Sequence, residues 1–159
     1  MKKIILLLVI VCLVSGCTPR VEKKESIYEK TEDENGEKVT TKIEVIKDNV
    51  FIAYTNDMFV NPESYKDKHI QIEGLLYSDF WNGTNADHTY VIRKTPGCCG
   101  DDGLAGIEIS YLGELPPYES WVIARGVWKE VLGSQNGWAL EIYSINVGPK
   151  GDEFLKFNY

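Results

Sequence analysis

The sequence predicts an all-β domain with one short helical turn, folded as a small OB-like five-stranded barrel. Five main segments show the apolar patterns of strands, and they recur at spacings of roughly 8 to 20 residues with glycines inside them. The chain has neither an internal repeat nor a long amphipathic helical pattern. A five-stranded Greek-key barrel fits these observations best, and a β-sandwich is the alternative.

The first predicted elements precede the main strands. Residues 38–46 alternate Val39, Ile43 and Val45 with polar or charged residues, which is typical of a half-buried strand. The run Val50–Tyr54 is short and apolar, and we group it with the strands. Pro62 is placed to open the one predicted helical turn, since proline is favoured at the first helical position.

The main strands are predicted over residues 69–77, 88–93, 105–111, 120–128 and 138–147. The first passes Gly74, a residue type at which strands often bend. The segment 120–128 is apolar on both faces, as a central strand would be. Beyond Gly148 and Pro149 we expect a loose tail until Phe154 or Phe157 packs on the domain.

The aromatic residues, 11% of the chain, have two possible uses. Trp81, Trp121, Trp128 and Trp138 could form an exposed stacking surface or fill the interior of the barrel. We expect them to fill it, because aromatic side chains bury large areas and a domain of this size needs that burial.

The N-terminus reads as a bacterial lipoprotein signal. Lys2 and Lys3 precede an apolar run over residues 4–14, which is too short to span a membrane. Small residues then lead into Cys17, and this stretch resembles the bacterial lipobox. The resemblance implies cleavage before Cys17 and acylation of its sulfur, and two or more acyl chains suffice for stable anchoring at the outer face of a membrane.

The predicted organisation therefore has three parts. Residues 1–16 are the signal peptide, residues 17–37 are the lipidated cysteine and a flexible tether, and residues 38–159 are the β domain. The alternative for the tether is a hairpin turned at Asn35 and Gly36.

Charge excludes one class of partner. The chain has 17 basic and 24 acidic residues, a formal net charge of −7, and the leader would remove two lysines and no acid. Nucleic-acid binding requires lysine and arginine to neutralise phosphates, so we expect no nucleic-acid partner.

Four short motifs resemble a known family. They are "NPESYKDK", "HIQIEG", "YVIRKTPGCCGDD" and "SWVIARG", spread between Phe59 and Trp128. They are similar to the soluble C-terminal domain of a poorly characterised bacterial family found with membrane permeases and linked to zinc homeostasis. That resemblance implies functional positions at Arg93, Cys98, Cys99 and Asp102. The chain departs from the family pattern in its lipid anchor, where the family has transmembrane helices, and in Gly100-Asp101 before Asp102.

The adjacent cysteines Cys98 and Cys99 allow three interpretations. Thiolates together with Asp101 or Asp102 could bind zinc, or the sulfur pair could bind copper. The cysteines could instead form a strained vicinal disulfide with a redox role. They could also simply pack as small apolar residues.

The two histidines are separated by topology. His88 begins the strand that leads to the cysteines, which places it roughly 20 Å from them if the chain stays extended. His69 begins the preceding strand, so antiparallel pairing would bring it to the cysteine end. The candidate metal ligands are therefore Cys98, Cys99, Asp102 and His69, although a solvated strand end is an equally simple role for His69.

No pattern of catalytic residues stands out in the sequence, so we expect a binding module rather than an enzyme. The expected function is extracytoplasmic binding of a metal ion, zinc or copper, together with a membrane permease. The alternatives are a thiol-redox accessory protein and a structural domain of the cell envelope.

Overall fold

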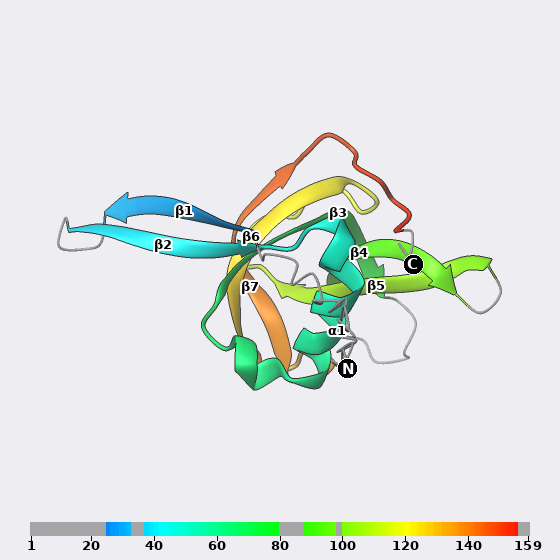
Figure 1. Cartoon of the computed structure of the whole chain (residues 1–159), viewed down its shortest axis with the longest axis horizontal. Coiled ribbons are helices and arrows are strands. Elements are labelled where there is room, and N and C mark those ends of the chain that lie inside the picture. The colour runs from blue at the N-terminus through cyan, green and yellow to red at the C-terminus, as the bar shows by residue number, and fades with distance from the viewer. Residues whose placement is uncertain (1–24, 33–36, 80–87, 98–99, 156–159) are drawn as a thin grey trace, which may run out of the picture.

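The structure is a computed structural model that describes residues 25–32, 37–79, 88–97 and 100–155; the side chains of residues 31, 32, 79, 97 and 100–102 are outside this description. The elements in chain order are β1 (Glu25–Glu32), β2 (Lys38–Val45), η1 (Asp48–Val50), α1 (Phe51–Val60), η2 (Pro62–Tyr65), β3 (His69–Asp79), β4 (His88–Gly97), β5 (Gly100–Ser110), β6 (Trp121–Glu130) and β7 (Trp138–Val147). Figure 1 shows a barrel from which two hairpins, β1–β2 and β4–β5, extend in opposite directions.

Five strands close the barrel in the order β3-β4-β5-β7-β6, because β6 also pairs with β3. β5 and β7 pair in parallel, whereas the other ladders of the barrel are antiparallel. This closed mixed barrel with one short helix confirms the predicted fold class, and the sandwich alternative is wrong. Closure leaves the barrel without the long open edges that a flat sheet would expose.

The N-terminal hairpin replaces part of the predicted tether. β1 pairs antiparallel with β2 over all eight residues, from Glu25↔Val45 to Glu32↔Lys38. β2 continues into the sheet by pairing in parallel with the start of β3. The hairpin alternative therefore describes this part of the chain.

The leader and Cys17 lie outside the described residues, as do Asn35 and Gly36. Within the described ranges, no helix has the length and apolar character needed to cross a membrane.

Helix α1 corrects one expectation from the sequence. The run Val50–Tyr54 opens this helix and is not a strand. Its buried residues are Phe51, Tyr54, Thr55 and Met58. Their spacing is that of one helical face, but a short apolar run cannot be assigned to helix or strand by periodicity alone. The predicted turn at Pro62 is confirmed as η2.

Gly74 marks the point at which β3 changes partners, as its predicted bend suggested. β3 pairs with β6 from His69 to Leu75, and with β4 from Leu75 to Asp79. A Cβ atom at Gly74 would lie 2.3 Å from the carbonyl oxygen of Ile92, so only glycine allows this close approach.

The core confirms the expected burial for three of the four tryptophans, and Trp81 lies outside the described residues. Trp121, Trp128 and Trp138 are buried, and the rings of Trp128 and Trp138 stack with centroids 6.2 Å apart. The C-terminal tail packs where Phe154 forms a parallel bridge with Lys94 and Leu155 is buried, while Phe154 itself stays partly exposed.

Candidate functional site

The β4–β5 hairpin contains the cysteine motif. Its ladder runs outward from Thr89↔Ile109 to Thr95↔Gly103 and closes at Gly97↔Gly100. The chain therefore reverses between the two paired glycines, which are separated in sequence only by Cys98 and Cys99. The cysteines themselves lie outside the described residues, so their bonding state stays a prediction.

A bulge lies beside this closing pair. Between Thr95↔Gly103 and Gly97↔Gly100 the register shifts, so that Asp101 and Asp102 on β5 face Pro96 alone on β4. Proline has no N–H to donate to a ladder, and a bulge is one of the few places in a sheet that tolerates it. The side chains of both aspartates lie outside the description, and their predicted role as ligands stays open.

His69 lies in a different part of the sheet. Its strand neighbours are Ile43 on β2 and Val127 on β6, and its ring lies 5.7 Å from the ring of Tyr143. The predicted antiparallel pairing of β3 with β4 exists, but it covers only Leu75–Asp79 of β3, because residues 69–75 of β3 pair with β6. The described pairings thus place His69 six residues before the part of β3 that contacts β4.

Arg93 is fully buried at the base of the hairpin. Its Nε donates to the Glu73 carbonyl at 2.9 Å, and Nη1 donates to the Asp152 carbonyl. Nη2 donates to the carboxylates of Asp48 at 2.8 Å and Glu73 at 3.4 Å. The guanidinium also stacks 4.3 Å above the centroid of Trp121.

These contacts join elements that are far apart in sequence. Arg93 connects β4 to η1 through Asp48, to β3 through Glu73 and to the C-terminal tail through Asp152. Because its donors are already used inside the protein, the predicted binding residue acts here as an internal cross-link. An arginine between apolar residues of a predicted strand is the sequence signal for this role.

A second cluster of polar side chains connects α1 to the sheet and to η2. Tyr54 donates a hydrogen bond to Glu44, Tyr65 donates one to Asp57, and the two rings meet edge to face at 5.2 Å. Burial, followed by the hydrogen bond to the carboxylate, raises the pKa of both phenols well above the usual range. Both side chains therefore stay protonated donors at neutral pH.

The opposite end of the barrel holds a pocket that the sequence interpretation missed. We call it the loop-end pocket; its polar lining comprises His88, Thr89, Glu108, Ser110, Tyr118 and Ser134. Its volume is about 410 Å³. The sequence interpretation excludes His88 from the cysteine site, because His88 begins the strand that leads to the cysteines. The structure confirms that it lies at the far end of β4.

The loop-end pocket contains a histidine–carboxylate pair. His88 Nδ1 lies 2.8 Å from Glu108 Oε1, and both side chains are mostly buried. The other carboxylate oxygen of Glu108 accepts the backbone N–H of Gln135 at 2.8 Å. A carboxylate on one ring nitrogen fixes the orientation of the imidazole and leaves the other nitrogen for a ligand.

Among the residues that the structure describes, no three His, Cys, Asp or Glu side chains converge as a metal site would require. The model of the DUF1980 C-terminal domain family matches residues 21–147, which includes the β1–β2 hairpin and ends with the last residue of β7. No curated protein matches the chain significantly.

Proposed function

The chain belongs to the DUF1980 C-terminal domain family, which is uncharacterised, and from this premise we propose that it is an envelope lipoprotein whose barrel binds a metal ion through the thiols of Cys98 and Cys99. The observation that supports this proposal is the closing pair Gly97↔Gly100 of the β4–β5 hairpin. Only the two cysteines separate these glycines in sequence, so a reversal of the chain there allows both sulfurs to turn toward one ion.

The chemistry of the motif favours a borderline or soft cation. Two thiolates suit zinc or copper, and Asp101 or Asp102 offers a carboxylate as a further zinc ligand. The bulge at the two aspartates supports this choice, since bulges change the direction of side chains and often lie beside functional sites. His69 is the weakest of the four predicted ligands, because its strand pairs with β2 and β6.

The rest of the described hairpin supports binding rather than thiol catalysis. Arg93, the cation that could lower a thiol pKa, uses its donors on Glu73, Asp48 and Asp152. A reactive thiolate needs an electropositive setting, whereas two aspartates follow this pair. The thiol-redox and purely structural alternatives then become outcomes of the test.

The test is metal content and thiol titration of the full chain in detergent, purified without a reductant and measured again after reduction. We expect bound zinc or copper in equimolar amount, lost in Cys98→Ser and in Cys99→Ser, and weakened in Asp102→Asn. His69→Ala and the leader variant Cys12→Ser serve as controls that keep the metal. Protein without metal and with free thiols would contradict the proposal. Protein without titratable thiols, lighter by the hydrogens lost on oxidation, would favour the vicinal disulfide.

The membrane anchor is tested separately. If Cys17 is acylated, Cys17→Ser moves the protein from the membrane fraction to the soluble fraction and leaves metal binding unchanged, because the barrel lies in a different part of the chain. Retention of Cys17→Ser in the membrane fraction would contradict the lipoprotein assignment. If a permease is the partner, cross-linking in cells should recover it with the anchored protein and should not recover it with the released Cys17→Ser variant.

A further inference from the structure

We propose that the loop-end pocket is a second binding site, and that its ligand is an uncharged oligosaccharide. The pocket lies at the end of the barrel opposite the cysteine hairpin, among the start of β4, the end of β5 and the loops that follow β5 and β6. Its volume of about 410 Å³ is within the range of small-molecule sites. This inference is independent of the proposed metal function, because the two sites share no residue.

One wall of the pocket is a rigid loop between β6 and β7. The N–H of Val131 donates to the Gly137 carbonyl at 3.0 Å, and the N–H of Ser134 donates back to Val131 at 3.2 Å. Gly133 and Gly137 have φ angles of 92° and 83°, which a residue with a side chain rarely adopts. The loop is therefore held in one conformation before any ligand arrives.

The facing wall presents Tyr118 from the β5–β6 connection. Glu119 has a φ of 66°, and its N–H donates to the Leu76 carbonyl at 2.8 Å, while the N–H of Leu76 donates to Ser120 at 2.9 Å. These bonds fix the turn to β3. They leave the Tyr118 ring 49% exposed, with its hydroxyl 3.4 Å from Thr89 Oγ1. An exposed but anchored aromatic ring is a suitable platform for the apolar face of a sugar.

The polar groups of the pocket suit a ligand rich in hydroxyl groups. Thr89, Ser110 and Tyr118 have hydroxyls that can bond sugar hydroxyls, and the Ser134 hydroxyl, which donates to the Val131 carbonyl, can still accept. His88 is oriented by Glu108, and among the described residues its Nε2 has no hydrogen-bond partner. The imidazole is thus free to bond one further hydroxyl.

Charge distinguishes this ligand class from others. Among the described residues, neither lysine nor arginine lines the pocket, and the side chains of His88 and Glu108 already interact with each other. A phosphate or an oligonucleotide would find no cation there, and a metal ion would find too few ligands among the described side chains. An uncharged polar ligand needs neither a cation nor a set of metal ligands.

The architecture supports the same choice. Small five-stranded barrels of this kind bind oligonucleotides or oligosaccharides on their second and third strands and at adjoining loops. Here β4 and β5 are the second and third strands of the barrel, and the β6–β7 loop adjoins them. Because a net charge of −7 disfavours the binding of oligonucleotides, oligosaccharides are the ligand class of these two that fits this chain.

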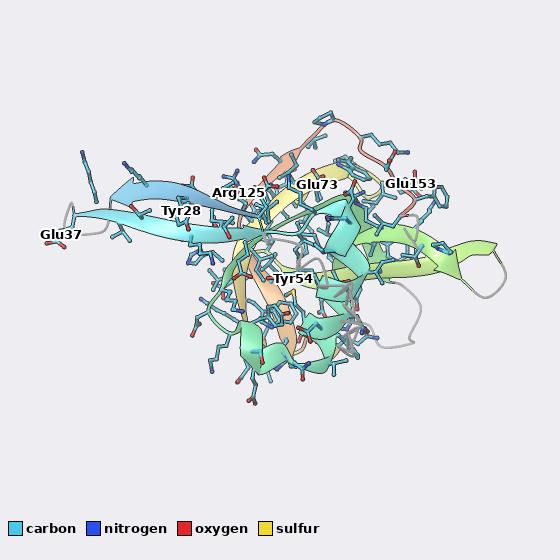
Figure 2. The ribbon with its side chains drawn as sticks, in the orientation of Figure 1. Tyr28, Glu37, Tyr54, Glu73, Arg125 and Glu153 are labelled. Atoms are coloured by element: carbon cyan, nitrogen blue, oxygen red, sulfur yellow. The ribbon has the colours of Figure 1, made fainter. Side chains whose placement is uncertain are left out.

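The test is a titration of the isotopically labelled full chain in detergent with three neutral trisaccharides: N-acetylchitotriose, cellotriose and maltotriose. We expect at least one to shift the amide signals of His88, Ser110 and Ser134 with a Kd of about 1 mM or tighter. Tyr118→Ala should weaken binding by up to about tenfold, the factor expected for one aromatic contact. The matched control is Tyr28→Ala, a more exposed tyrosine on the β1–β2 hairpin (Figure 2), which should change nothing.

Three results would overturn the proposal. They are no shift with any of the three sugars, equal affinity of Tyr118→Ala and the unmodified protein, and binding of an oligothymidylate to the same signals. Variants of Cys98 and Cys99 should bind the sugar normally, so failure of this proposal is distinguishable from failure of the metal site.

Discussion

Replacement of Arg93 by methionine is expected to destabilise the protein without affecting either proposed ligand. The guanidinium is fully buried and donates to two backbone carbonyls and two carboxylates, so methionine fills part of the volume but removes every polar contact. Breaking a buried ion pair by removing one partner costs about 3–5 kcal/mol. The side chains of Asp48 and Glu73 are 53% and 39% exposed, so water can solvate them after the change. The expected loss is therefore about 3 kcal/mol, near the lower end of that range.

That loss is large for a domain of this size. Folding free energies of single domains are about 5–15 kcal/mol, so the variant should unfold at clearly lower urea concentration, with a Tm lower by on the order of 10 °C. Arg93→Lys should recover only part of the loss, because an ammonium group cannot reproduce the planar fork of donors. Urea denaturation followed by tryptophan fluorescence measures both variants, since the buried tryptophans report on the barrel.

The matched control is Arg125→Met. Arg125 is also on a barrel strand and also bonds a side chain, with Nε 2.8 Å from Gln71, but its side chain is 32% exposed. A partly exposed pair of this kind contributes at most about 1 kcal/mol. Equal destabilisation by the two methionine variants would refute the role given to Arg93. An Arg93→Met protein of normal stability that has lost its metal would show that Arg93 serves the ligand instead.

Three further predictions concern the fold. Burial holds the pKa of Tyr54 above its ordinary value of 10.0, so the unfolded chain loses the phenol proton before the folded protein does as pH rises. The free energy of unfolding should therefore decline above about pH 10, and it should decline less steeply in Tyr54→Phe. Urea denaturation across this pH range measures both. In the same assay, Gly106→Ala should destabilise the protein more than Gly133→Ala. A Cβ atom at Gly106 would lie 2.2 Å from a backbone carbonyl oxygen, whereas a Cβ atom at Gly133 would enter open space, and only the φ angle of 92° would be unfavourable there. Leu155→Ala should lower the free energy of unfolding by about 2–5 kcal/mol and Phe154→Ala by much less, since Leu155 is buried and Phe154 is 41% exposed. Similar urea midpoints for the two variants would mean that the tail does not pack on the barrel.

The barrel could be predicted because its strands are defined by local patterns. Alternation over residues 69–77 predicted the strand, and the glycine within it predicted a bend at Gly74, beside which β3 changes partner. Helix α1 was missed, because its first turn is a short apolar run whose helical spacing becomes visible only when Met58 is known to be buried. The β1 strand was predicted only as the alternative to a tether, because its charged sequence is stabilised by pairing with β2 rather than by burial.

The sites were less accessible from the sequence, since they depend on which strands meet. The inference that placed His69 near the cysteines assumed that β3 pairs with β4 along its whole length, whereas the barrel closes by pairing the start of β3 with β6. His88 lies beside Glu108, 20 residues away in sequence, because β4 and β5 pair antiparallel with Thr89 opposite Ile109. The family resemblance implied a functional position at Arg93, and the sequence could not show that Asp48 and Asp152 reach it from elements far apart in the chain.

The most direct test of the metal-binding account is a zinc titration of the labelled full chain, followed through its backbone amide signals. We expect the signals of Thr95, Gly103 and Leu104, which lie beside the closing pair of the β4–β5 hairpin, to shift until one equivalent of zinc is bound. The signals of His88 and Ser134 at the loop-end pocket should stay unchanged, and the double variant Cys98→Ser/Cys99→Ser should show no shift. Zinc-dependent shifts at His88, or an unresponsive hairpin in the reduced protein, would contradict the account.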